Sequence, residues 1–148
     1  MIELARMRWW HLPAVMRIEQ SVFPQTAWTE GQFWGELARV PQARDYTVAI
    51  DGGEVLGYVG TNLVPPESDI QTIAVAQHTQ GQGIGRLLLN HAIKIAVQRG
   101  CSSMFLEVRE DNVAAISMYE NFDFTRLQMR RNYYGSGLHG IVMKKALS

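Results

Sequence analysis

The stretch that decides the fold runs from Ile73-Ala74-Val75 to Gln80-Gly81-Gln82-Gly83-Ile84-Gly85-Arg86. A short apolar segment, typical of a buried strand, leads through a glycine-rich turn into a long amphipathic pattern that predicts a helix. Glycine lets the backbone bend tightly and brings its N–H groups close to a ligand. The first turn of a helix adds unpaired N–H donors and a partial positive charge. The stretch therefore predicts a site for phosphate groups.

The spacing of these glycines excludes two familiar phosphate sites. A dinucleotide site needs Gly-x-Gly-x-x-Gly and an acidic residue about twenty positions later, whereas Gly81, Gly83 and Gly85 simply alternate. No Gly-Lys-Ser/Thr follows, as the phosphate loop of ATPases requires. The pattern that remains is Gln80-x-x-Gly83-x-Gly85. The alternative is a tight connection between strand and helix that binds no ligand.

The composition is that of one globular domain spanning residues 1–148. Apolar residues make up 47% of the chain, and 14 basic residues balance 14 acidic ones. Because there is no net charge to attract nucleic acid or a membrane surface, we expect neither as a partner. Cys101 is the only cysteine, which fits a reducing compartment. Residues 1–11 lack the apolar run of a signal peptide, so we expect a cytoplasmic protein.

Hydrophobic periodicity and turn residues predict the order β-α-α-β-β-β-α-β-α-β-β. The predicted strands are 2–8, 46–50, 55–63, 69–76, 103–109, 124–134 and 138–145, and the predicted helices are 13–22, 29–40, 84–99 and 112–121. Thr29 and Gln32 form a capping box for the second helix. We expect the third helix to bury a face made of Ile84, Leu87, Leu88, Ala92, Ile95 and Ala96. This order implies an α/β (α+β) domain with helices on both faces of a mixed sheet.

A carboxylate stands in a predicted inner strand, in Leu106-Glu107-Val108-Arg109. Burying it is costly unless it has a partner or a function. One interpretation is an ion pair between Glu107 and Arg109, which share a face of the strand. The other is a general base that accepts a proton from an attacking ammonium, directly or through water. Tyr119 on the next helix is by itself a common core residue, but its hydroxyl is also able to protonate a leaving thiolate.

Two adjacent tyrosines occur in Arg130-Arg131-Asn132-Tyr133-Tyr134, at the end of a predicted strand beside glycines. The alternation of a strand would put one ring on each face. One interpretation is an ordinary aromatic strand end. The other is a groove that grips a peptide backbone, because such rings combine an apolar body with a polar group.

Together these segments resemble the GNAT N-acetyltransferases, and within that family the branch that acetylates the N-terminal alanine of a small-subunit ribosomal protein. Phe23-Pro24, Trp28-Thr29 and Phe33 resemble an early loop of that branch. The resemblance implies a GNAT fold, with a mixed, mostly antiparallel sheet of about seven strands, a splayed gap and four flanking helices. It also implies acetyl-CoA as cosubstrate and the N-terminus of a ribosomal protein as the acceptor.

The resemblance also assigns roles to individual residues. Glu107 becomes the proton acceptor and Tyr119 the proton donor, and Trp28, Tyr133 and Tyr134 are expected at the peptide. The residues expected to hold acetyl-CoA are Ile73, Ala74, Val75, Gly81, Gln82, Gly83, Ile84, Gly85, Arg86 and Asn112.

Three positions depart from the family pattern. Gly81 stands where many members carry arginine, which removes a side-chain contact to phosphate. Asp123 replaces the glycine usual before Phe124, so that turn must settle its backbone in another way. Met118 replaces a common leucine of similar volume. None of these changes touches the proposed acid or base.

We expect the amine to attack the thioester directly, because no activated cysteine or serine suggests a covalent step. No metal is expected, since His11, His78, His91 and His139 lack short metal-ligand spacing. Two alternatives stay open: acetylation of lysine or of a small amine, and a CoA-binding module without activity. Glu107 and Tyr119 together favour an enzyme. The sequence leaves the oligomeric state and the exact substrate open.

Overall fold

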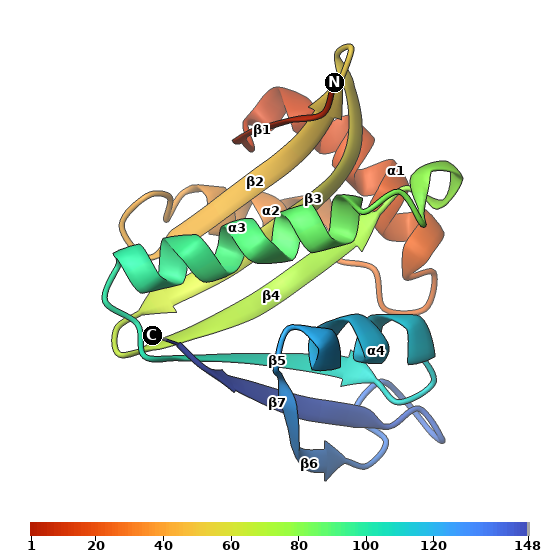
Figure 1. Ribbon diagram of the computed structural model, residues 1–148. Helices are drawn as coiled ribbons and strands as arrows, with labels where there is room; N and C mark the ends of the chain where they lie inside the picture. The colour runs from red at the N-terminus through yellow and green to blue at the C-terminus, as the bar shows by residue number, and fades with distance from the viewer. Residues whose placement is uncertain (148) are drawn as a thin grey trace.

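A seven-stranded sheet with the order β1-β2-β3-β4-β5-β7-β6 forms the centre of the computed structural model, which describes residues 1–147 (Figure 1). The strands are β1 Glu3–Arg6, β2 Arg44–Asp51, β3 Glu54–Val64, β4 Glu67–Val75, β5 Ser103–Arg109, β6 Thr125–Arg130 and β7 Gly140–Ala146. The α-helices are α1 Leu12–Val22, α2 Glu30–Leu37, α3 Ile84–Gln98 and α4 Val113–Asn121. The predicted GNAT-type architecture of seven strands and four helices is confirmed.

The sheet splays open between β4 and β5, its one parallel pair within residues 1–147. These strands pair where Glu67–Asp69 meets Ser103–Phe105, and then diverge (Figure 1). Just past this fork β4 carries an extra residue, Gln71, because Thr61 and Gly60 on β3 face Ile70 and Thr72. Such a bulge bends and twists a strand locally. The fork and the bulge together create the predicted gap.

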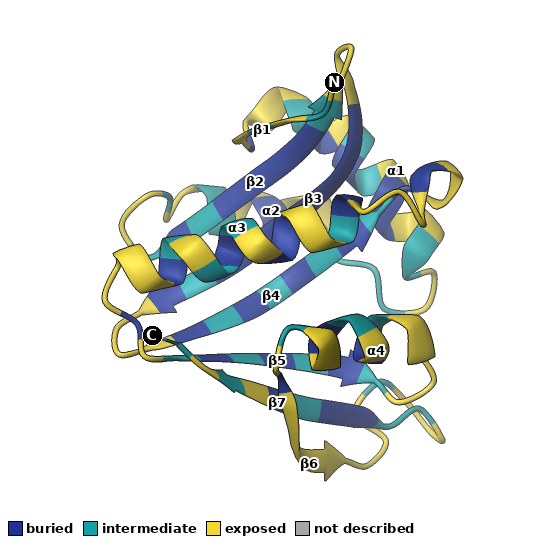
Figure 2. Cartoon of the chain, viewed as in Figure 1, coloured by how far each residue is buried: buried dark blue, intermediate teal, exposed yellow. Residues whose placement is uncertain are grey.

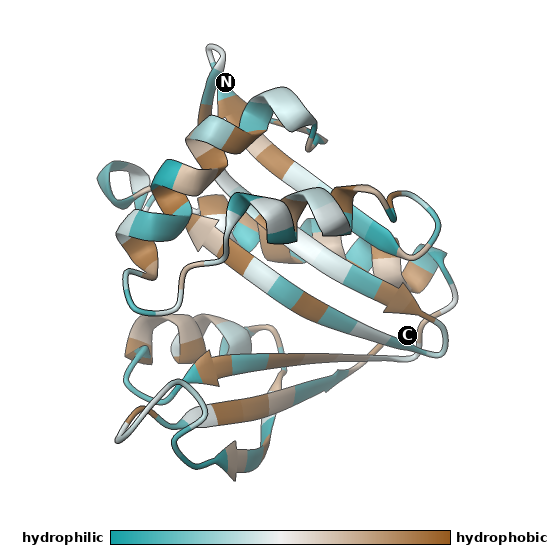
Figure 3. Cartoon of the chain, turned by 180° about the vertical axis from the view of Figure 1, so that it is seen from behind, coloured by the Kyte–Doolittle hydropathy of each residue, from teal (hydrophilic) through white to brown (hydrophobic). Residues whose placement is uncertain are grey.

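Helices cover both faces of the sheet. α3 crosses one face with its buried side inward (Figure 2), and α1 and α2 cross the other (Figure 3). α4 shares the core of α3, since Ile116 and Tyr119 pack in the same cluster as Leu88. Leu87 was wrongly predicted to be buried: it is 38% exposed, and Leu89 is buried in its place. The buried stripe of α3 consists of Ile84, Leu88, Ala92 and Ala96, which are four residues apart. The sheet also covers the side of this stripe that carries Leu89, and it leaves the side that carries Leu87 exposed.

The element boundaries follow local chemistry. The capping box is confirmed, since Thr29 Oγ1 accepts from the Gln32 N–H at 3.2 Å and Gln32 Oε1 accepts from the Thr29 N–H at 2.7 Å. α2 ends at Leu37, earlier than the predicted Val40. No helix among residues 1–147 has the length and apolar character needed to cross a membrane.

The predicted strand end at the paired tyrosines is wrong. β6 ends at Arg130, and the tyrosines lie in a turn. Asn132 adopts a left-handed backbone (φ 54°), and its side-chain oxygen accepts from the Gly137 N–H at 2.8 Å. Asn tolerates this conformation better than most residues, so it reverses the chain before the tyrosines are reached.

Candidate functional site

A cleft of about 1170 Å³ opens at the fork of the sheet. Its walls come from β4, the glycine turn, β5, α4 and the loop 23–28 between α1 and α2. Of the residues predicted for the site, those that line it are Trp28, Ile73, Ala74, Val75, Gly81, Gly83, Ile84, Gly85, Arg86, Glu107, Asn112, Tyr119 and Tyr134. Gln82 and Tyr133 were also predicted for the site, but they do not line the cleft.

The three glycines of the turn are required for two different reasons. Gly81 and Gly83 both have φ near 84°, where a residue with a side chain is strained. A Cβ on Gly85 would lie 3.3 Å from Met118 Sδ, across the cleft on α4. The left-handed backbone at Gly81 also gives a physical reason for glycine where many family members carry arginine.

The start of α3 is built to receive an anion. Gly83 is its N-cap, and no side chain among residues 1–147 caps its first turn. The N–H groups there and the helix dipole favour a phosphate group. The Gln80 side chain donates to the Val75 carbonyl at 3.2 Å, which ties the turn to the end of β4. These residues therefore fit the pyrophosphate of acetyl-CoA.

Two further groups shape this half of the cleft. Asn112 caps α4, since its Oδ1 accepts from the Ala115 N–H at 3.2 Å. Arg86 lies on the first turn of α3, with its guanidinium 6.0 Å from the centre of the Phe122 ring. The first turn of α3 and the C-terminal end of α4 are therefore close to each other.

Glu107 has a different partner from the one considered from the sequence. Its Oε1 accepts from Arg130 Nη1 on β6. Arg109 instead pairs with Asp111 at 2.8 Å and donates to Gln25 Oε1 at 2.9 Å. The Glu107–Arg109 pair is therefore not formed. Glu107 Oε2 is buried and has no hydrogen-bond partner within residues 1–147.

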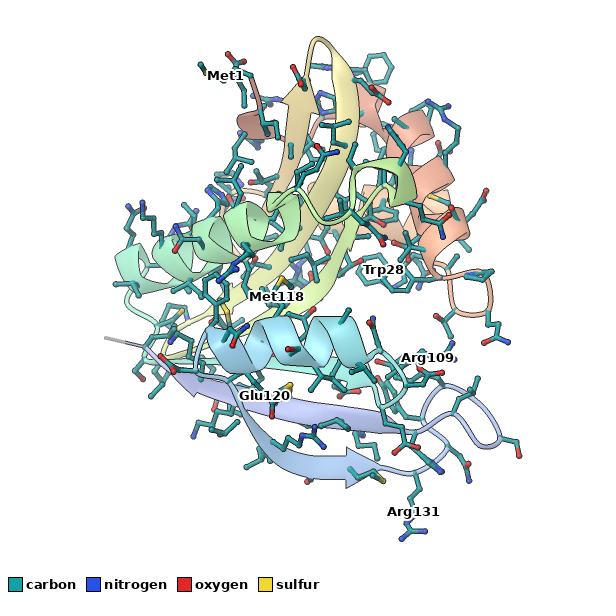
Figure 4. All side chains as sticks on the ribbon, turned by 45° about the vertical axis from the view of Figure 1, so that its right-hand side comes forward. Met1, Trp28, Arg109, Met118, Glu120 and Arg131 are labelled. Atoms are coloured by element: carbon teal, nitrogen blue, oxygen red, sulfur yellow. The ribbon has the colours of Figure 1, made fainter. Side chains whose placement is uncertain are left out.

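The cation that holds Glu107 also organises the paired tyrosines. The Arg130 guanidinium lies 4.3 Å from the centre of the Tyr133 ring, and Tyr133 meets Tyr134 edge-on at 4.9 Å. Tyr134 reaches the cleft, where burial and then the Glu107 charge raise its pKa to about 12. Arg131 points outward into solvent (Figure 4).

Tyr119 lies on α4 and is among the residues that line the cleft. It is 5% exposed and packs edge-on against Phe124, with 5.9 Å between ring centres. Burial, and secondarily Tyr134, raise the pKa of Tyr119 above its ordinary value. Its hydroxyl therefore stays protonated at neutral pH.

Glu19 is a buried carboxylate of the cleft that was not predicted from the sequence. Its Oε2 accepts from the Trp28 N–H at 3.1 Å, and its Oε1 accepts from the hydroxyls of Tyr58 and Thr72. The signal was present in the sequence. Glu19 stands four residues after Val15, on the apolar face of an amphipathic helix.

Trp28 lies where the loop 23–28 meets α2, at the edge of the gap between the two halves of the sheet (Figure 4). It packs against Phe33 at 5.1 Å. Residues 1–147 contain no group of three or more His, Cys, Asp or Glu side chains placed to hold a metal ion.

Comparisons with known proteins agree with this geometry. Residues 5–124 match the model of the Acetyltransferase (GNAT) family. The chain is 37% identical over 125 residues to the [ribosomal protein bS18]-alanine N-acetyltransferase of Escherichia coli, covering 83% of this chain and 80% of that one. It is 38% identical over 123 residues to the N-alpha-acetyltransferase RimI of Mycobacterium tuberculosis, covering 80% of this chain and 75% of that one.

A solved structure extends the likeness to the whole fold. The crystal structure of the ribosomal-protein-S18-alanine N-acetyltransferase from Escherichia coli matches with a TM-score of 0.88 and 31% identity. The match covers 100% of this chain and 95% of that one. The strand order, the splayed gap and the matched sequence lead to one conclusion: this chain belongs to the GNAT acetyltransferase family.

Proposed function

We propose that this chain transfers the acetyl group of acetyl-CoA to the N-terminal α-amine of a protein, and that its substrate is the N-terminal alanine of a small-subunit ribosomal protein. The main support is that one cleft joins a phosphate-binding turn on β4 and α3 to Glu107 and Tyr119 on β5 and α4. The names of the relatives in Escherichia coli and Mycobacterium tuberculosis favour the same substrate. A ribosomal substrate would be met in the cytoplasm.

In this proposal the glycine turn anchors acetyl-CoA. The backbone N–H groups from Gly81 to Arg86 receive the pyrophosphate, and Asn112 contacts the ligand from the start of α4. The edge of β4 from Ile73 to Val75, which faces the cleft beyond the fork, offers backbone groups to the pantetheine arm. When bound, acetyl-CoA supplies the activated acyl group.

Glu107 and Tyr119 then divide the proton chemistry. The unpartnered Oε2 of Glu107 accepts a proton from the amine, directly or through water. The Tyr119 hydroxyl donates a hydrogen bond, and in the end its proton, to the leaving sulfur. Because burial raises the pKa of Tyr119, its hydroxyl stays protonated and is a hydrogen-bond donor to the sulfur.

An α-amine suits a site with a single carboxylate as base. It titrates near pH 7.7–8.0, so about a tenth of the amine is already neutral at pH 7, against fewer than about one in a thousand lysines. Trp28 and Tyr134, which both line the cleft, suit a peptide chain. A small polycation would instead favour clustered carboxylates.

The test measures acetyl-CoA consumption and product mass with a peptide panel. The panel holds a ribosomal N-terminal peptide beginning with alanine, the same peptide with other first residues, and the same peptide with a blocked N-terminus and an added lysine. Polyamines complete it. We expect turnover with free α-amines and highest kcat/KM with alanine first. Turnover only with lysine or polyamines would overturn the peptide proposal, and binding of acetyl-CoA without any turnover would favour a non-catalytic module.

A further inference from the structure

Glu19 is a buried carboxylate that the proposed chemistry does not use. It is 2% exposed on α1, between the sheet and the loop 23–28. One oxygen accepts from the sheet, through the hydroxyls of Tyr58 on β3 and Thr72 on β4. The other accepts from the loop, through the Trp28 N–H at 3.1 Å. Glu19 thus connects three separate elements at the cleft wall.

A carboxylate at this position is costly without a purpose. Its neighbours on the same helix face, Leu12, Val15 and Ile18, are buried and apolar, and an apolar residue would complete that face. Burying the carboxylate is offset only by its hydrogen bonds. Burial and then Glu19 raise the pKa of Tyr58, so its hydroxyl stays a donor.

The loop that Glu19 holds forms much of the cleft wall. Its cleft-lining residues are Phe23, Pro24, Gln25, Thr26 and Trp28. At one end the Phe23 N–H donates to the Glu19 carbonyl at 2.8 Å, and near the middle Arg109 reaches Gln25 across the gap. Trp28, whose N–H donates to Glu19, is the last residue of the loop, directly before the Thr29 cap of α2.

We propose that Glu19 is a positioning residue, which holds the loop 23–28 against the sheet and so sets the wall that receives the first residues of the substrate. It does not take part in proton transfer. The substrate named here rests on the proposed function, whereas the anchoring of the loop does not.

The kinetic test compares Glu19→Leu, Glu19→Gln and Tyr58→Phe. Leucine leaves the Trp28 N–H without its acceptor, so the KM for the peptide should rise about tenfold or more while the Kd for acetyl-CoA changes less than about twofold. Glutamine should restore the peptide KM, because its carbonyl can accept from Trp28 while its amide donates to the two hydroxyls. Tyr58→Phe keeps the loop bond, so it should lower thermal stability and leave the KM near wild type.

Equal peptide KM values in wild type and Glu19→Leu would overturn the proposal. The proposal would also be overturned if Tyr58→Phe, which keeps the loop bond, raised the peptide KM in proportion to its loss of stability. A second measurement, amide hydrogen exchange of the folded wild-type protein, tests the anchor without using activity or the leucine variant. We expect a protected Trp28 amide, and exchange at the rate of a free amide would also overturn it. If wild type acetylates no peptide but Trp28 is protected, the substrate assignment fails and the anchor stands.

Discussion

The two oxygens of Glu107 have different environments, and this difference matters more than the presence of the residue. Oε1 is held by Arg130, whereas Oε2 is buried and without a partner in the described chain. The ion pair fixes the side chain, and Oε2 is the oxygen to which we assign the proton of the amine. The same carboxylate on an exposed strand would find water on both sides.

Replacing Glu107 with glutamine should remove the proton acceptor and keep the bond from Arg130. General-base catalysis contributes about 10²–10⁴-fold, so we expect kcat to fall by about that factor while the Kd for acetyl-CoA stays within about twofold. Steady-state kinetics and titration calorimetry measure the two. Glu110→Gln, an exposed neighbour, is the matched control. A kcat unchanged across pH would remove Glu107 from this role.

Tyr119 is expected to act only as the thiolate leaves. Tyr119→Phe keeps the packing against Phe124 and deletes the hydroxyl. We predict a kcat about 10–100-fold lower with little change in acetyl-CoA affinity, because the lost interaction forms in the transition state. A thioester with a better leaving group should recover part of the rate. Wild-type turnover in the variant would assign Tyr119 to packing alone.

At the scale of the element, the end of α4 keeps a backbone conformation that favours glycine, although the residue there is Asp123. Asp123 has φ 69°, a left-handed conformation, and its N–H donates to the Glu120 carbonyl at 3.0 Å. The chain reverses there so that Phe124 enters the core, where it is 2% exposed. The residue also puts a negative charge at a helix C-terminus, where the dipole disfavours it.

Asp123→Gly should therefore stabilise the protein. Relief of left-handed strain and removal of the charge outweigh the added entropy of the unfolded chain, for a net gain of about 0.5–1 kcal/mol. Asp123→Asn should gain only a few tenths of a kcal/mol, roughly, because it removes the charge and keeps the left-handed strain. Asp123→Val should lose about 1–2 kcal/mol, since branched residues tolerate this backbone poorly. Urea unfolding of the three variants measures the order, and a valine variant as stable as glycine would contradict it.

At the scale of the whole molecule, tyrosines are buried on both faces of the splayed sheet. Tyr46 and Tyr58 pack under α1 and α2, and Tyr119 packs from α4 into the core on the opposite face. Burial is the largest cause that raises the pKa of each, and of Tyr134 to about 12. Folding therefore depends on all four hydroxyls keeping their protons.

This predicts loss of stability in alkali. A tyrosine whose folded pKa lies above its unfolded value of about 10 contributes stability that is complete below pH 10 and is lost as pH rises through the folded pKa. For Tyr134 that window is pH 10 to about 12. Urea unfolding at about pH 8 and about pH 11 should show a fall in the free energy of unfolding, and Tyr58→Phe should reduce the fall. Equal values at both pH values would contradict the prediction.

Local patterns predicted much of this protein, because their causes lie within a few residues. The glycine turn was predictable because Gly81 and Gly83 readily adopt the positive φ that the turn needs. The start of α2 was predictable because Thr29 and Gln32 cap it. The alternation in β5 put Glu107 and Arg109 on one face, as the structure has them. The missing glycine marked Asp123 as an unusual position, but the expectation of a different backbone there was wrong, because Asp123 keeps a left-handed φ of 69°.

The tertiary structure alone decided which side chains become partners when their elements are distant in the chain. Arg130 rather than Arg109 holds Glu107, because two further strands bring that cation across the sheet. Glu19 gains Trp28, Tyr58 and Thr72 only when α1 packs on the sheet. A sequence pattern records which residues need partners, through periodicity and burial. Which partner each one finds depends on packing over the whole chain.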